Sequence, residues 1–415
     1  MCVYKNKAKK IMQLKKILKT KMKNGKKLLM DNTLPAELFF LFYNKPAEIK
    51  AEQEEHRKKK RKTTWIFLLV NVVIVAAIFI YQFCFGETKP LSELFAEKPF
   101  YRFFFISLGV LAVYYLVIAI SYSILFKQTT GKFRFWLGLQ FAIVGKYWDN
   151  ITPFGSGGQF GQVAHGRKKG IPGDKTTSIV VGKYMINMIA FVTLGIAVLF
   201  IPIDTFTSGN VIKWLALAGV IINLLLTLFI WIVSTNRKLF SVIVGGGIKI
   251  LHKMHIIKDY QKALYKSMRF IKQYQQAFKY FIKKPWVVIC EFFLNLIEWI
   301  AISFIPYLIY LAFNFPDINV SVIPVIAMSI LCTFATSYIP IPGGSGMAEI
   351  SFAALFSKLF TPGVTFWALI FWRIFTYYLF IIIGFVFTLI DPAISKKAEQ
   401  IKERRAQKLA EREQK

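Results

Sequence analysis

Three polar side chains interrupt one long apolar segment of this chain at a spacing that places them together. Glu291, Asn295 and Glu298 stand at positions i, i+4 and i+7 of the segment 286–313, so they share one face of a helix. Each ionised side chain at the centre of a membrane helix costs roughly 2.5–3.5 kcal/mol on insertion scales. The stripe must therefore face a polar cavity or a basic partner.

Two basic partners are available in other apolar segments. Arg373 is one candidate, and Lys183, with Asn187 one helical turn later, is the other. Two interpretations stay open: the stripe lines a polar path, or it forms a static buried salt bridge that fixes helix packing.

A second kind of chemistry is indicated by two loops rich in proline and glycine. Residues 151–159 read ITPFGSGGQ, and residues 338–346 read YIPIPGGSG. Proline and glycine end helices, and non-helical backbone at membrane depth is tolerated only where it is buried in protein or lines a cavity. Paired interruptions of this kind point to a transport site in a membrane protein.

These loops predict an anion site built from backbone N–H groups, because the helical segments that follow them begin with electropositive N-termini that suit a phosphate. The roles of two side chains near the loops stay open. Glu349 either stabilises the N-terminus of its own helix or contacts a cationic headgroup or a proton, and Lys146 either extends its ammonium group to the membrane surface or contacts a phosphate. The expected headgroup-binding residues are Asp149, Asn150, Pro153, Gly155, Gly157, Gly158, Gln159, Pro342, Gly343, Gly344, Gly346, Glu349, Glu291, Glu298 and Arg373.

Motifs of enzymatic chemistry are weak in this sequence. It contains no GxxxxGK[ST] loop, no HExxH pattern and no GxSxG elbow. Its four cysteines are scattered without CxxC spacing, which disfavours a zinc site or a disulfide framework. We therefore expect no catalytic residue, no metal and no cofactor.

The elements that must position these residues are membrane helices. The chain is 55% hydrophobic, and its mean hydropathy is +0.47. Segments near or above the roughly 20 residues that cross a bilayer are 64–85, 100–126, 176–201, 211–234, 286–313, 320–338 and 364–390. Two shorter apolar stretches, 134–148 and 347–360, flank the loops.

Together these segments predict an all-α polytopic membrane protein. Residues 135–162 lie between two basic clusters and read as a re-entrant hairpin, whereas 347–360 is counted as a crossing. The expected fold has about eight transmembrane helices plus that hairpin.

The net charge of +32 is concentrated beside the apolar segments. Residues 1–63 carry 19 Lys and Arg against 6 Asp and Glu, and 235–285 carries 12 against one. No nucleic-acid-binding motif accompanies this charge, so we expect cytoplasmic segments beside anionic lipid and no nucleic-acid partner. The predicted organisation is a basic cytoplasmic segment 1–63, a membrane domain 64–391 and a charged cytoplasmic tail 392–415, with loops 86–99 and 314–319 outside.

The two loops also carry a resemblance. Residues 147–159 (YWDNITPFGSGGQ) and 337–349 (SYIPIPGGSGMAE), with the weaker match 372–379 (WRIFTYYL), resemble the flippase-like transmembrane family named after lysylphosphatidylglycerol synthetase. The resemblance covers about 64–391. After the first loop, QFGQ at 159–162 departs from the more usual Gln-Pro-Phe-Gln.

The resemblance implies translocation of a phosphate-bearing lipid, such as phosphatidylglycerol or its lysyl form, through a central cavity of a multi-pass protein in a bacterial plasma membrane. Bifunctional members add a soluble C-terminal domain that transfers lysine from lysyl-tRNA. Only 24 residues follow Asp391 here, so we do not expect synthase activity. The alternatives are a lipid-modifying enzyme of the phosphatidylglycerol lysyltransferase type and an accessory protein for a lipid-linked glycosyltransferase; a homo-oligomer or a separate synthase partner stays open.

Overall fold

A computed structural model describes residues 99–202, 210–235, 237–253, 263, 283–313, 320–337, 339, 341–356, 358–360 and 362–391. The chain divides into two compact units, 1–63 and 64–415, and all described residues belong to the second. The basic head, the expected crossing 64–85, the loop 314–319 and the tail 392–415 lie outside the described residues.

Every described element is a helix, which confirms the predicted all-α class. In chain order they are α5 (Pro99–Thr130), α6 (Phe135–Ile151), η1 (Pro153–Gly155), α7 (Gly157–Lys168), α8 (Gly173–Val198), α9 (Asn210–Thr235), α10 (Arg237–Lys253), α12 (Pro285–Ser303), α13 (Ile305–Ala312), α14 (Val322–Thr336), η2 (Pro342–Gly344), α15 (Met347–Leu355), α16 (Pro362–Arg373) and η3 (Ile374–Tyr378).

Among the described residues, four helical stretches are long and apolar enough to cross a membrane. They are Tyr101–Thr130, Lys175–Val198, Pro285–Ala312 and Gly363–Asp391, each within a few residues of a predicted crossing. The last of them contains η3, a π-helical turn that begins directly after Arg373. Shorter apolar helical stretches are Leu217–Phe229 and Val322–Thr336.

The helices on either side of the second proline- and glycine-rich loop are shorter than the sequence predicted. Residues 347–360 were expected to cross the membrane, but α15 has 9 residues, and α14 before it has 15. At 1.5 Å per residue these helices are about 14 and 22 Å long, below the roughly 30 Å of a hydrocarbon core. The two helices pack together through η2, with the Cys332 Sγ 3.9 Å from the Ala348 carbonyl oxygen. The structure thus has a second helical hairpin here, and the number of crossings stays a prediction.

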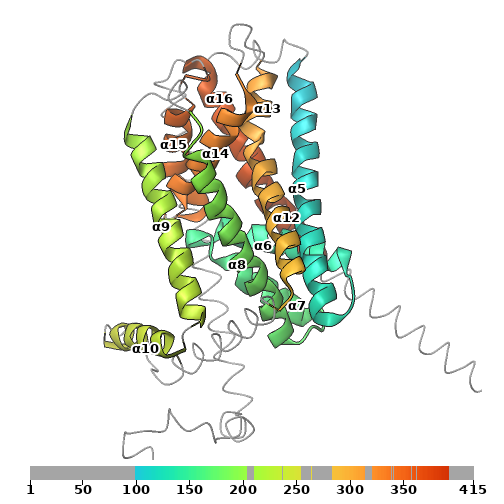
Figure 1. The fold of residues 1–415 in the computed structure, drawn as a ribbon. Helices are drawn as coiled ribbons and strands as arrows, with labels where there is room; N and C mark the ends of the chain where they lie inside the picture. Colours follow the sequence, from blue (N-terminus) through green and yellow to red (C-terminus); the bar gives the residue numbers. More distant parts are fainter. Residues whose placement is uncertain are drawn as a thin grey trace, which may run out of the picture. The chain divides into compact units, whose positions relative to one another are not determined.

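The two hairpins enter the helical bundle from opposite ends. Figure 1 shows α6 and α7 in its lower half and α14 and α15 in its upper half. Their turns, η1 and η2, contact each other. The hydroxyl of Tyr377 donates to the Asn150 carbonyl at 3.3 Å, which ties the first turn to the last helix. The two predicted loops therefore meet inside the protein, as buried non-helical backbone requires.

Aromatic packing fixes this meeting point. The ring of Phe191 stacks between those of Trp299 and Phe334, at centroid distances of 4.3 and 3.9 Å. In η2, Gly343 has φ +65°, and a Cβ there would lie 2.1 Å from the Tyr377 ring. Glycine is required at this position both by the backbone conformation and by the close approach of the last helix.

Candidate functional site

A cavity of about 340 Å³ lies where the two hairpins meet. Both turns line it, through Phe154 and Gly155 of the first and Gly343 and Gly344 of the second. Two basic residues, Lys146 of α6 and Arg373 at the end of α16, also reach its wall. The wall further contains the polar side chains of Tyr114, Asp149, Asn150, Ser303, Ser329, Thr333, Thr336, Ser337, Thr376 and Tyr377.

Arg373 is held by the second hairpin. Its Nε donates to Glu349 Oε1 at 2.6 Å, and its Nη1 donates to the Gly343 carbonyl at 3.0 Å. Glu349 also accepts the N–H of Gly346 at 2.6 Å through its other oxygen, so it both caps α15 and neutralises the arginine. Arg373 Nη2 is buried without a hydrogen-bond partner among the described residues, which leaves its two N–H donors unused.

Lys146 is held less tightly than Arg373. Its Nζ lies 3.7 Å from Glu298 Oε1, and 5.2 Å from the centre of the Tyr114 ring. Its side chain is 24% exposed, the highest value among the ion-paired side chains near the cavity. Asp149, one turn after it on α6, accepts the N–H of Gly158 at 2.8 Å.

The loops do not bind an anion in the way that the sequence predicted. Gly157 N donates to Thr152 Oγ1 at 2.8 Å, and Gly158 and Gly346 donate to the Asp149 and Glu349 side chains. The N–H groups of Gly155, Ser156, Gly344 and Ser345 donate to carbonyl oxygens within their own turns. The expectation of free backbone donors at these residues is therefore wrong, because each turn closes on itself before any ligand binds.

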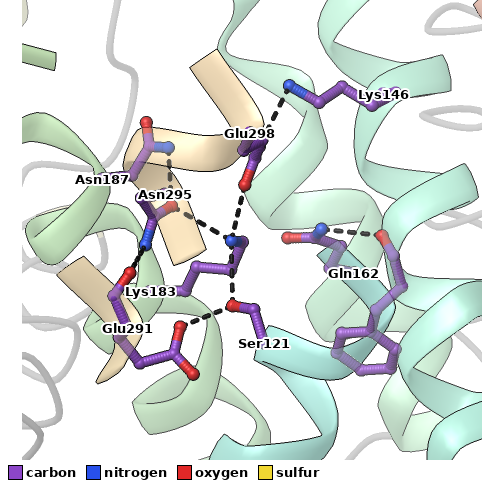
Figure 2. Close-up of polar contacts among 9 residues, drawn as sticks. Ser121, Lys146, Gln162, Lys183, Asn187, Glu291, Asn295 and Glu298 are labelled. Atoms are coloured by element: carbon purple, nitrogen blue, oxygen red, sulfur yellow. Dashed lines mark hydrogen bonds and ion pairs between the residues drawn. The ribbon is translucent and has the colours of Figure 1, made fainter. Parts of the chain in front are cut away.

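The stripe on α12 finds Lys183 as its partner rather than Arg373. Lys183 Nζ donates to Glu298 Oε2 at 2.9 Å, to Asn295 Oδ1 at 3.1 Å and to Ser121 Oγ at 3.0 Å (Figure 2). Ser121 in turn donates to Glu291 Oε2. The sequence named Lys183 as one of two candidates, and the packing of α8 against α12 selects it.

The predicted site residues thus separate into three groups. Asp149, Asn150, Gly155, Gly343, Gly344 and Arg373 line the cavity. Glu291 and Glu298 do not belong to its wall and lie in the buried cluster around Lys183. Pro153, Gly157, Gly158, Gln159, Pro342, Gly346 and Glu349 shape the turns or hold residues that line the cavity.

Sequence reasoning missed Ser121 and Trp299. Ser121 is completely buried and joins Lys183 to Glu291, and Trp299 lines the cavity beside Lys146. Ser121 is followed by Tyr122 and Ser123 on α5, and Trp299 directly follows Glu298. A single small hydroxyl and a single aromatic carry no spacing that would have distinguished them.

A further polar cluster lies at the end of the bundle where α7 finishes. Lys169 Nζ donates to Asp391 Oδ1 at 2.6 Å, and the His165 Nε2 lies 2.9 Å from Gln140 Oε1. Burial lowers the pKa of His165 to about 4, with a smaller contribution from the nearby lysines and with Asp391 acting in the opposite direction. This imidazole is therefore neutral at pH 7 and donates its Nε2–H to Gln140.

The chain matches a model of a known protein family. The family model described as the lysylphosphatidylglycerol synthase TM region matches residues 61–384, which is most of the chain and includes both loops and Arg373. No curated protein matches the chain, and no solved structure matches it. The matched range contains the whole described bundle except its last residues.

Proposed function

This chain belongs to the lysylphosphatidylglycerol synthase transmembrane family, and we propose that it translocates a membrane lipid with a phosphate-bearing headgroup. Family membership and the apolar helices establish a membrane protein with a lipid-related role. The observation that carries the finer proposal is the cavity between the two hairpins, whose wall combines two cations and the carboxyl group of Asp149 with polar, aromatic and aliphatic side chains.

The charges of the cavity suit a phosphate diester. The Nη2 of Arg373 retains unused N–H donors, and Lys146 is only loosely paired at 3.7 Å from Glu298. Guanidinium groups bind phosphate oxygens strongly, and lysine adds a point charge. A phosphate that reached both side chains would gain charge-assisted hydrogen bonds worth about 1.5–3 kcal/mol each.

The position of the cavity suits translocation. Each hairpin is too short to cross a membrane, and the two enter from opposite ends of the bundle and meet at their turns. Transporters commonly place their substrate site where interrupted helices meet, and they expose it alternately by moving one part against the other. We propose that the headgroup passes this meeting point while the acyl chains stay in the bilayer.

Lipid identity and orientation are part of the same proposal. Phosphatidylglycerol and lysyl-phosphatidylglycerol both carry the phosphate diester that the two cations would bind. The lysine and arginine bias favours a cytoplasmic position for both termini, and we propose that the membrane is a bacterial plasma membrane. The basic segment 235–285, whose first part is α10, would then lie beside anionic lipid.

Reconstituted proteoliposomes test the proposal. Fluorescent phosphatidylglycerol in the outer leaflet is destroyed by an impermeant reductant, and the protected fraction reports movement between leaflets. Lys146→Gln and Arg373→Gln should each slow this movement by about 10- to 100-fold at low lipid concentration, which corresponds to the loss of one charge-assisted hydrogen bond.

The matched control is Lys132→Gln, which removes an exposed lysine between α5 and α6, away from the cavity. It should leave the rate unchanged. The proposal fails if wild-type protein moves no lipid, or if folded Lys146→Gln and Arg373→Gln both match the wild-type rate. The same proteoliposomes, given lysyl-tRNA, measure whether the chain forms lysyl lipid instead.

A further inference from the structure

The cluster around Lys183 is a second buried polar site, distinct from the cavity wall. Glu291 and Asn295 are completely buried, and Lys183 and Glu298 are 5% and 4% exposed. These residues come from α8 and α12, and Ser121 of α5 completes the cluster (Figure 2). The cluster holds two carboxyl groups but one fully buried cation.

Lys183 has no hydrogen bond left for Glu291. An ammonium group has three N–H donors, and those of Lys183 go to Ser121, Asn295 and Glu298. The amide of Asn295 donates to the Glu291 backbone carbonyl at 2.6 Å rather than to the Glu291 side chain. The amide of Asn187 donates to Asn295 Oδ1 at 2.8 Å.

Glu291 therefore lacks the hydrogen-bond donors and the directly paired cation that a buried carboxylate needs. Its Oε2 accepts one hydrogen bond, from Ser121, and its Oε1 is buried without a partner among the described residues. An ionised carboxylate in such a place would lack the donors and the counter-charge that make burial tolerable. With Glu291 protonated, Lys183 and Glu298 balance each other.

We propose that Glu291 is a proton-binding site that couples proton movement to the movement of the lipid headgroup, an inference that rests on the proposed translocation. The ligand of this second site is the proton itself. The energy for directional transport would then come from a proton gradient.

Lys146 connects the two sites. It lines the cavity and also lies 3.7 Å from Glu298, the residue that holds Lys183. A phosphate bound in the cavity draws Lys146 toward itself and away from Glu298. Lys183 then remains as the cation that balances the charge of Glu298. Lys183 is then less able to turn toward Glu291, and Glu291 keeps its proton.

Loss of the proton from Glu291 has the reverse effect. Lys183 would turn from Glu298 toward Glu291, and Glu298 would then hold Lys146 away from the cavity. Headgroup binding and proton binding therefore favour each other, and because such coupling is reciprocal, proton binding raises headgroup affinity by the same factor. Lipid and proton should move in the same direction.

The other groups around the cluster are consistent with this role for Glu291. From α5, Ser121 and Tyr122 face it, and the Tyr122 ring lies 5.4 Å from Lys183 Nζ. Lys183 approaches from α8, and Glu298 lies two turns after Glu291 on α12. Asp149 and Lys146 of α6 interact with Glu298 and act on Glu291 through it.

A proton gradient across proteoliposomes tests the inference. With the membrane voltage clamped and a difference of one pH unit, one proton carried per anionic lipid concentrates labelled phosphatidylglycerol about tenfold in the leaflet that faces the alkaline side. Glu291→Gln keeps the shape of the protonated acid but binds no proton, so its lipid should equilibrate evenly. Thr193→Val, an outward-facing change on the helix that carries Lys183, is the matched control and should behave as wild type.

Infrared absorption gives a readout that does not depend on transport. At neutral pH, wild-type protein should show the carbonyl stretch of a buried protonated carboxyl group, and Glu291→Gln should lack that band while it retains its thermal stability. Absence of the band in wild-type protein overturns the inference. An equal lipid distribution with and without the gradient also overturns it but leaves the proposed function standing, whereas no lipid movement at all refutes the proposed function itself.

Discussion

The ion pair between Arg373 and Glu349 allows a quantitative test of how the cavity is built. Both side chains are 5% exposed, and their closest atoms are 2.6 Å apart. Removing one partner of such a buried pair costs about 3–5 kcal/mol, because the other charge is left without compensation. We expect Arg373→Met to lower the free energy of unfolding by that amount.

The double variant separates the pair from the rest of the packing. Glu349→Gln retains an oxygen that accepts the N–H of Gly346, so it should cost less than Arg373→Met. With both charges removed, no uncompensated charge remains. The double variant should therefore be more stable than the sum of the single effects by about 2 kcal/mol, within the range of directly coupled neighbours.

Unfolding in mixed micelles with a rising fraction of SDS, followed by tryptophan fluorescence, measures these free energies. The control pair is Lys169 and Asp391, whose atoms are also 2.6 Å apart but whose side chains are 20% and 15% exposed. Its coupling should lie nearer the value of exposed pairs, about 0–1 kcal/mol.

A coupling of about 0.6 kcal/mol for Arg373 and Glu349 would refute this reasoning, because that is the average of ordinary hydrogen bonds between membrane helices. Equal couplings for the two pairs would refute it as well, since burial would then make no difference.

Three further predictions concern the turns, the pH dependence and the orientation. Gly343→Ala should destabilise the protein in the same SDS assay, because its Cβ would lie 2.1 Å from the Tyr377 ring at a φ of +65°. The pKa of His165 is about 4 in the folded protein and about 6.5 in the unfolded chain, so between these pH values only the unfolded chain binds the proton. The melting temperature should therefore fall as the pH falls from about 7 to 5. His165→Gln should reduce that fall. Residues 202–210 contain no Lys or Arg, so this loop is expected outside, and Phe200 just before it is 83% exposed. In a cysteine-free background, Phe200→Cys should therefore react with an impermeant thiol reagent in intact cells, and Lys132→Cys should react only after lysis. The reverse pattern would invert the proposed orientation.

Much of the fold was predictable from the sequence because membrane helices are encoded locally. Hydropathy over about 20 residues places the crossing helices within a few residues of their observed ends, and the proline and glycine loops mark where helices stop. The i, i+4, i+7 spacing of Glu291, Asn295 and Glu298 likewise required only helical periodicity, and the structure brings all three to one polar cluster.

The sequence was a weaker guide to which helices are long enough to cross the bilayer. The apolar stretch 347–360 reads as continuous, but the helix ends at Leu355, which leaves α15 far too short to cross. Its role as one arm of a hairpin depends on α14 packing beside it, which is a tertiary contact.

The chemistry of the site was decided by tertiary structure alone. Arg373 and Lys183 were both possible partners for the carboxylates of α12, and only the packing of the helices assigns Arg373 to Glu349 and Lys183 to Glu298. The loop glycines were expected to have free N–H groups, but the side chains of Asp149 and Glu349 accept hydrogen bonds from two of these groups. The physical reason is that sequence spacing fixes which face of a helix a side chain occupies, whereas the partner of a buried charge depends on which other helix presents a group within about 3 Å, and that distance exists only in the packed bundle.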